Sequence, residues 1–474
     1  METKTTTNDS SPTERLFLRL LVAITLLHCA VLAFRIPVFS RLPGWFWWYT
    51  DKPWGDLFSW SLIVLSVLMV LILIRMNTRH HLAVLVMFVV AGYTLQHGFA
   101  LLEGRGINGI RDRMITTGHA EFAHTAVKQQ DVWSTLTHYE ELLRDEKLSA
   151  FAQSKPPGQL LLYMATERLA NAKAAAEPEA KRFDRLTTFA SYLWPLITYL
   201  AIFPLFWIGR MFTNEQVAIR TCALYLFVPS VTLVTLHTDQ VFFPLFGLLV
   251  FLVGIHAIRR QSWAYGVLLG VVFYIALFFT FGFLLFVPLI TLIGLLYGWQ
   301  QKTLKRILVL LVMVLIGVVA AHFLFRLMLN YDIVTRYQSA ITHHVAWKGW
   351  KTGTAYTIMV VNLIEFATWL GMPVALSCLA GLLSSATELK SERRSWSDFL
   401  AVSLAVAVLC MDVLGRTRGE IARLWLFVVP FMCLIAVSHV YRLFKPAKAN
   451  LVFVAIVFLE MATTYLTKVR QDFW

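Results

Sequence analysis

The chain has 474 residues, of which 58% are hydrophobic, above the roughly 45–50% apolar content of a soluble domain. Lysine and arginine (42 residues) outnumber aspartate and glutamate (28), and much of this excess lies in short connectors between apolar runs, where positive charge keeps loops in the cytoplasm. The composition therefore predicts a multi-pass membrane protein and argues against nucleic acid as a partner. The five cysteines show no CxxC spacing, so neither a disulfide framework nor a thiolate metal site is indicated.

Apolar runs long enough to cross about 30 Å of hydrocarbon follow one another along the chain. They lie near residues 16–34, 57–74, 82–102, 188–209, 217–236, 240–258, 307–328, 358–384, 399–414, 421–441 and 449–467. Residues 264–300 are too long for one span, and Gly282 and Pro288 divide them into two short ones. The predicted fold is an all-α polytopic bundle of about 11–13 transmembrane helices with one large external loop.

Basic connectors alternate along these runs, and the positive-inside rule places every second connector in the cytoplasm. The long hydrophilic segment 103–187 then faces outside, together with Asp239 and residues 329–357 and 415–420. Polar groups are costly to bury in a membrane, so their gathering at one face predicts a functional site there. The chain divides into N-terminal spans (1–81), a central region that includes the external segment (82–300) and a C-terminal transmembrane region (301–474).

Two carboxylates, Glu121 and Asp239, are the leading candidates for a general base, since each lies outside the predicted spans and near histidines. Asp239 belongs to the sequence His237-Thr238-Asp239, in which His237 is a candidate substrate-binding residue. The alternatives are a solvated loop acid for Glu121 and an N-cap of the next span for Asp239.

A metal site is weakly indicated in the external segment. His119, Glu121 and His124 could supply two ligands to a divalent cation if the segment bends, and His138 with Glu140 could complete the shell. A His-x-Glu pair is common by chance, so we expect no tightly held structural zinc. Dependence on a divalent cation stays open at this point.

Arginines near residue 420 and Lys155 are candidate phosphate ligands. Arg416, Glu420 and Arg423 recur at helical spacing just before an apolar run, with Arg418 beside them. Arginine can hold phosphate with two parallel hydrogen bonds, although an internal Arg–Glu pair is the alternative for Arg423. Lys155 precedes a rigid double proline, and its alternative is a surface lysine. The apolar residues 160–170 that follow are expected to form an interfacial helix.

Several of these features in order resemble the GT-C glycosyltransferases, a membrane class that includes protein O-mannosyltransferases and bacterial aminoarabinose transferases. The large external segment ends in Lys155-Pro156-Pro157-Gly158, and a later span closes in Gly209-Arg210-Met211-Phe212. A span with Pro229 leads to Thr238-Asp239, and residues 266–288 form a broken apolar pair. The resemblance covers about residues 82–300 in pattern, and the Lys-Pro-Pro and Thr-Asp sequences carry most of it.

The resemblance implies an inverting enzyme in the bacterial cytoplasmic membrane that uses a polyprenyl-phosphate sugar on the external face. Its acceptor would be a lipid, a glycan or a protein. Lys155 matches the phosphate-proximal lysine of the class and Asp239 its second acidic position. The first acidic position departs from the pattern, which leaves Glu103, Asp112 and Glu121 as alternatives for the base. A polytopic transporter and a non-catalytic envelope-assembly protein are the rival interpretations, and the oligomeric state is open.

Overall fold

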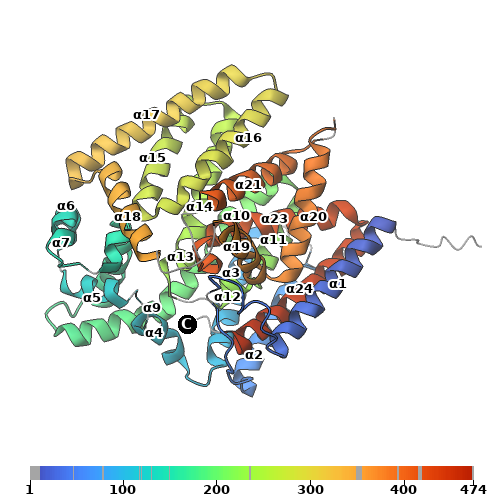
Figure 1. The fold of residues 1–474 in the computed structure, drawn as a ribbon, viewed down its shortest axis with the longest axis horizontal. Helices are drawn as coiled ribbons and strands as arrows, with labels where there is room; N and C mark the ends of the chain where they lie inside the picture. The colour runs from blue at the N-terminus through green and yellow to red at the C-terminus, as the bar shows by residue number, and fades with distance from the viewer. Residues whose placement is uncertain are drawn as a thin grey trace, which may run out of the picture.

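A computed structural model describes most of the chain. The described residues are 11–45, 47–76, 80–116, 118, 120–129, 131–148, 150–233, 236–348, 355–391, 394–414 and 419–471. Within these ranges the secondary structure is helical, and the only extended pairing is an isolated bridge between Tyr49 and Gln471. The helices pack into one bundle (Figure 1). The predicted all-α class is confirmed.

Nine helical segments in the described ranges are long and apolar enough to cross a membrane. They are α1 (Pro12–Ala33), α3 (His81–Leu101), α9 with α10 (Glu179–Tyr199, Ile202–Phe212), α13 with α14 (Thr238–Val241, Phe243–Arg260), η2 with α16 (Phe281–Leu285, Phe286–Gln300), α17 (Leu304–Leu329), α21 (Trp396–Val413), η3 with α23 (Leu426–Val428, Val429–Leu443) and α24 (Pro446–Arg470). A bent pair raises the number to ten, and α2 (Leu57–Leu73) and α15 (Trp263–Phe279) are shorter apolar helices. The protein is therefore an integral, multi-pass membrane protein, as predicted.

The predicted division of residues 264–300 is confirmed, because α15 ends at Phe279 and the next helical segment starts at Phe281. The predicted span 217–236 is wrong as a single helix. It contains α11 (Glu215–Tyr225) and the four-residue α12 (Pro229–Thr232), separated where Val228 takes an extended backbone before Pro229. Proline disfavours a helical conformation in the residue before it, which accounts for the break.

The predicted span 358–384 is also interrupted. Helix α19 (Ala355–Leu370) and α20 (Met372–Glu388) meet at a bend of 117°. The residue at the bend, Gly371, has a φ of +84°, which glycine adopts without steric cost. A Cβ atom there would lie 1.7 Å from Oε1 of Glu460, so glycine also makes room for this buried carboxylate.

The long hydrophilic segment contains a set of short helices. These are α4 (Ile107–Thr116), α5 (Ala120–Lys128), α6 (Val132–Thr137), α7 (Tyr139–Arg144), η1 (Ala150–Ser154) and α8 (Gly158–Ala170). The predicted helix over residues 160–170 is present as α8, and its position at the membrane interface stays a prediction. The buried Arg336 of α18 (Ile333–Lys348) holds α7 and η1 against α18. It donates to the carboxylate of Glu140 at 3.2 Å and to the carbonyl of Gln153 at 2.6 Å.

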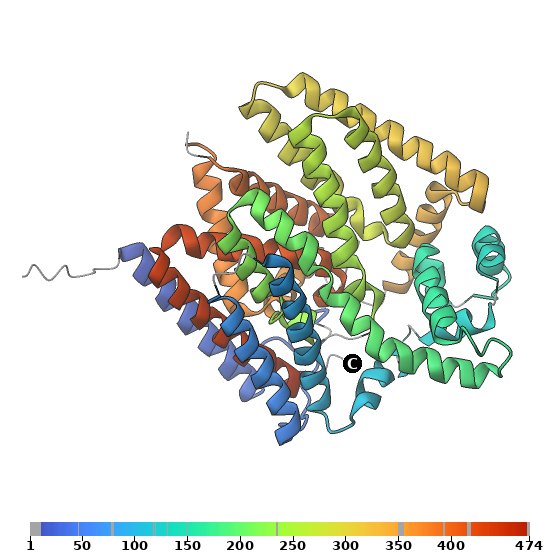
Figure 2. The ribbon, with the colours of Figure 1, turned by 180° about the vertical axis from the view of Figure 1, so that it is seen from behind.

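The first and last helices of the described chain lie together. Helix α24 packs along α1, and the two run side by side in both views of the ribbon (Figures 1 and 2). After α1 the chain stays beside the C-terminal end of α24, where the amide of Thr50 donates to the carbonyl of Arg470 at 2.9 Å. Residues near positions 50 and 468 therefore lie beside the end of α3, at the edge of the candidate site described next.

Candidate functional site

Asp239 and Arg423 form the centre of the candidate site. His237 caps α13, and Asp239 lies in its first turn. Arg423 comes from α22 (Ile421–Leu424), and its Nη1 atom lies 3.4 Å from Oδ2 of Asp239 and 3.1 Å from Nδ1 of His237. All three residues are buried, with at most 4% of their surface exposed. A buried arginine thus links two residues that the sequence placed in one short motif.

Glu420 supplies the second carboxylate of this group. Its Oε2 atom lies 2.5 Å from Nη2 of Arg423. Burial lowers the pKa of Arg423, but Glu420 and Asp239 outweigh it and raise that pKa, so the guanidinium stays charged. Glu420 has a φ of +59° immediately before α22, so the predicted helical face does not continue through it.

Helix α19 holds the segment that carries Arg423. Oε1 of Glu365 accepts hydrogen bonds from the amide of Ala422 at 3.1 Å and from the indole of Trp47 at 2.8 Å. One turn earlier, the side chain of Asn362 accepts from the amide of Gly419 at 3.4 Å. The buried polar groups of α19 therefore fix the backbone on both sides of Glu420.

The Lys-Pro-Pro-Gly sequence lies beside the Thr-Asp sequence. The hydroxyl of Thr238 donates to Oε1 of Gln159, in the first turn of α8, at 3.3 Å. A Cβ atom on Gly158 would lie 2.5 Å from the carbonyl oxygen of Phe278, so glycine lets α8 start against the end of α15. The two motifs that carried the resemblance are adjacent in space.

Lys155 belongs to the same group of charges. Its side chain is half-buried, and this burial lowers its pKa, while the nearby carboxylates of Asp239 and Glu420 oppose the effect. Arg423 adds to the lowering. An anion that joined the site would favour the charged form of this lysine.

Three buried polar atoms in this region have unused hydrogen-bonding capacity. Within the described residues, no hydrogen-bond partner is found for Oδ2 of Asp239, Nε2 of Gln159 or the hydroxyl of Tyr163. Burial and the charge of Asp239 raise the pKa of Tyr163, which therefore stays a neutral donor. Unsatisfied buried polar groups are rare and costly, so a cluster of them points to a polar ligand.

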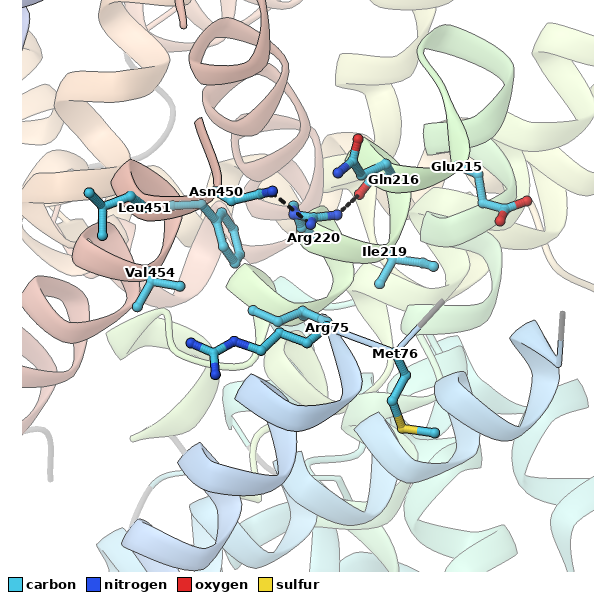
Figure 3. A pocket seen from close by; sticks show the side chains of 11 residues that line it. Arg75, Met76, Glu215, Gln216, Ile219, Arg220, Asn450, Leu451 and Val454 are labelled. Carbon is cyan, nitrogen blue, oxygen red and sulfur yellow. Dashed lines mark hydrogen bonds between the residues drawn. The ribbon is translucent and has the colours of Figure 1, made fainter. Parts of the chain in front are cut away.

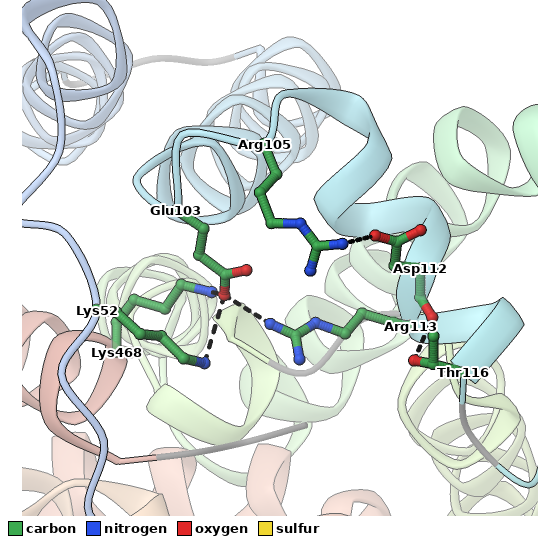
Figure 4. A network of polar contacts seen from close by, with 7 residues as sticks. All are labelled: Lys52, Glu103, Arg105, Asp112, Arg113, Thr116 and Lys468. Atoms are coloured by element: carbon green, nitrogen blue, oxygen red, sulfur yellow. Dashed lines mark hydrogen bonds and ion pairs between the residues drawn. The ribbon is translucent and has the colours of Figure 1, made fainter.

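Glu103 is the hub of a neighbouring ionic cluster (Figure 4). Its Oε1 atom lies 2.5 Å from Lys468, 2.5 Å from Arg113 and 3.4 Å from Lys52. Burial raises the pKa of Glu103, but the three cations outweigh burial and lower that pKa to about 2. Such a weak base is poorly suited to accept a proton at neutral pH.

Arg113 connects the two clusters electrostatically. Burial lowers the pKa of His237 well below its usual value, and the positive charges of Arg423, Arg113 and Lys155 lower it further. The imidazole is therefore neutral, and its Nδ1 atom accepts the hydrogen bond from Arg423. A neutral histidine adds no charge to a site already rich in cations.

The remaining candidate acids lie elsewhere. Asp112 pairs with Arg105, as Figure 4 shows, and Glu121 lies on the exposed face of α5. His124 stacks on Phe183, with ring centroids 4.1 Å apart. His119, Arg416 and Arg418 lie outside the described residues. In the part of the chain that the structure describes, no three His, Cys, Asp or Glu side chains are placed to share a metal ion.

Several members of the site carry no signal in the sequence. Lys52, Arg113 and Lys468 surround one carboxylate but come from distant parts of the chain. Tyr163 lies in the helix that was predicted at 160–170, but its place among apolar residues gave no sign of a polar role. The alternation of apolar and polar residues on α8 could at most have shown that Tyr163 faces the protein interior.

Comparison with known proteins gives a distant structural likeness. No family model and no curated protein matches the sequence. Solved structures of the oligosaccharyltransferase of Archaeoglobus fulgidus do align: the complex with zinc and sulfate at 13% identity and a TM-score of 0.45, and the apo form at 10% identity and a TM-score of 0.44. The alignments cover 81% and 87% of this chain, and 53% and 56% of the other.

A third structure, tethered to an acceptor peptide by a disulfide, aligns at 11% identity with a TM-score of 0.42. It covers 87% of this chain and 55% of the other, so the chain spans about half the length of these neighbours. The TM-scores are too low to assign an activity, so the function has to be inferred from the side chains.

Proposed function

We propose that the protein is a membrane glycosyltransferase that transfers a sugar from a polyprenyl-phosphate donor to a lipid, glycan or protein acceptor on the extracytoplasmic face. The observation that carries the proposal is the buried Asp239, which lies beside Arg423 and within electrostatic reach of Lys155. A base and cations at the membrane boundary are what such a transfer needs, because the prenyl chain keeps the donor phosphate at the interface.

Asp239 is the proposed general base. Its Oδ2 atom takes the proton of the acceptor hydroxyl as the acceptor oxygen forms a bond to the anomeric carbon. The bond from that carbon to the phosphate oxygen breaks, and the polyprenyl phosphate leaves with the electron pair. Attack on the face opposite the leaving group inverts the anomeric carbon. Glu121, Asp112 and Glu103 are the alternative bases, and the ion pairs of Asp112 and Glu103 disfavour those two.

Lys155 is the proposed main ligand of the leaving phosphate. Arg423 already bonds to Glu420 and His237 and forms an ion pair with Oδ2 of Asp239, so we assign it to positioning Asp239 as well as to neutralising the phosphate. Arg416 and Arg418 are proposed as further phosphate ligands from the segment before α22. Their guanidiniums would grip phosphate with paired donors.

A divalent cation does not fit the described residues. Asp239 lies among positive charges that would repel a metal ion, and no described group of acids and histidines forms a ligand set. One of the solved oligosaccharyltransferase structures is a complex with zinc and sulfate. For this chain we propose that lysine and arginine, rather than a metal, neutralise the phosphate.

The test is transfer by the purified protein in lipid nanodiscs, with a panel of radiolabelled polyprenyl-phosphate sugars and with lipid, glycan and protein fractions as acceptors. We expect transfer from at least one donor and none by Asp239→Asn. The matched control is Asp145→Asn, since Asp145 is exposed and pairs only with Lys147 among its described contacts. A transporter or an assembly protein would bind or move substrate without this transfer. Equal turnover by Asp239→Asn and wild type would refute the assignment.

A further inference from the structure

A cavity lies at the opposite end of the bundle from Asp239. It has a volume of about 710 Å³ and lies between the end of α2 and the starts of α11 and α24 (Figure 3). Helix α24 links the two ends, since Asn450 lines the cavity and Lys468 binds Glu103 beside the candidate site. Eighteen residues of helix separate them, or about 27 Å at 1.5 Å per residue.

The cavity contains a buried guanidinium. Arg220 of α11 is only 8% exposed, and it donates to Oδ1 of Asn450 at 2.8 Å and to the carbonyl of Gln216 at 3.2 Å (Figure 3). Its guanidinium also lies 5.1 Å from the ring centre of Tyr441. These neutral groups hold the side chain in one position. Its Nε atom is buried and has no hydrogen-bond partner among the described residues.

The charge of Arg220 has no counter-charge in the described part of the chain. Glu215, the one carboxylate that lines the cavity, lies 3.1 Å from His81, and Figure 3 shows it on the side away from Arg75. Arg75 extends from the end of α2 toward α24 and adds a second, exposed cation at the rim. A buried charge is stable when it is paired, so a bound anion would stabilise Arg220 and Arg75 in this cavity.

Apolar side chains complete the lining of the cavity and form part of its exposed rim. Leu451 is 70% exposed and Met76 is 50% exposed, while Ile219 and Val454 lie deeper. A soluble anion has no apolar surface to bury against these side chains, whereas the acyl chains of a lipid would pack on them. Basic pockets between membrane helices are suited to lipid phosphates, which arginine binds through paired donors.

We propose that this cavity binds the headgroup phosphate of an anionic membrane lipid, with Arg220 and Arg75 as its ligands and the acyl chains along Leu451 and Met76. The site lies at the membrane face opposite the candidate active site. It does not depend on the proposed glycosyltransfer, because no residue near Asp239 contributes to it.

The experiment measures lipid binding to the full-length, delipidated protein by native mass spectrometry and by titration in mixed micelles. The probes are phosphatidylglycerol and phosphatidylcholine. We expect wild type to bind phosphatidylglycerol at least about 10-fold more tightly than phosphatidylcholine. A charge-assisted hydrogen bond corresponds to a change of roughly 10- to 100-fold, so Arg220→Gln should weaken phosphatidylglycerol binding within that range. Arg75→Gln, at the exposed rim, should weaken it about 10-fold without disturbing packing.

The control is the double variant Arg260→Gln/Arg306→Gln, which removes two charges where each test variant removes one. These residues line a separate basic cavity at the same end of the bundle. The control should bind phosphatidylglycerol as wild type does. An equal loss in the control would show that diffuse surface charge binds the lipid, and unchanged binding in both Arg75→Gln and Arg220→Gln would overturn the site. Displacement of the lipid by millimolar inorganic phosphate alone would identify a soluble anion as the ligand instead.

Discussion

Replacement of Arg423 by alanine should destabilise the folded protein strongly. Arg423 is 4% exposed and Asp239 is 2% exposed, and the arginine is the cation closest to this carboxylate in the described contacts. Removing one partner of a buried ion pair costs about 3–5 kcal/mol, because the other charge remains buried without compensation. Glu420 loses its partner as well, but its side chain is 19% exposed and can reach water, so its share should be smaller.

A double-mutant cycle can show whether the unpaired Asp239 causes the loss of stability in Arg423→Ala. If the uncompensated Asp239 causes the cost, then Asp239→Asn should restore part of the stability in the Arg423→Ala background, with a coupling energy of about 0.5–3 kcal/mol. The assay is equilibrium unfolding in mixed micelles followed by tryptophan fluorescence. As a control, Arg326→Ala breaks an exposed pair with Asp332 and should cost about 0–1 kcal/mol. A coupling energy near zero between Arg423 and Asp239 would refute the reasoning.

Three further perturbations test other parts of the site. The pKa of Glu103 is lowered from 4.5 to about 2. Its ionised form therefore adds about 3 kcal/mol to the free energy of unfolding above pH 4.5, and this stabilisation is lost as the pH falls through 2. Unfolding measured against pH should show this loss in wild type and not in Glu103→Gln. Lys155→Ala should weaken donor binding about 10- to 100-fold, measured by donor titration, and unchanged affinity would exclude Lys155 as a phosphate ligand. Gly158→Ala should cost about 1–3 kcal/mol of unfolding free energy because of the contact with Phe278, whereas Gly109→Ala, with no neighbour within 3.4 Å, should not.

The sequence predicts the membrane spans well because hydropathy is a local property. It predicts their interruptions less well. The bend at Gly371 requires a positive φ and the nearby carboxylate of Glu460, and neither can be read from an apolar run that contains one glycine. The pairing of Glu420 with Arg423 was foreseeable, since three residues separate them. The contact between Glu103 and Lys468 was not, since 365 residues separate them.

The four candidate bases can be told apart only by their surroundings in the folded chain. In the sequence Glu121 and Asp239 are the leading candidates and Glu103 and Asp112 are alternatives, and nothing in the sequence decides which of the four is the base. In the structure Glu103 binds three cations, Asp112 pairs with an arginine near the surface, and Glu121 lies on an exposed helix face. Only Asp239 among these four combines full burial with an oxygen that has no hydrogen-bond partner in the described residues. A carboxylate acts as a base only if its neighbours leave it an oxygen for a proton, and those neighbours come from α8, α13 and α22, which only the fold brings together.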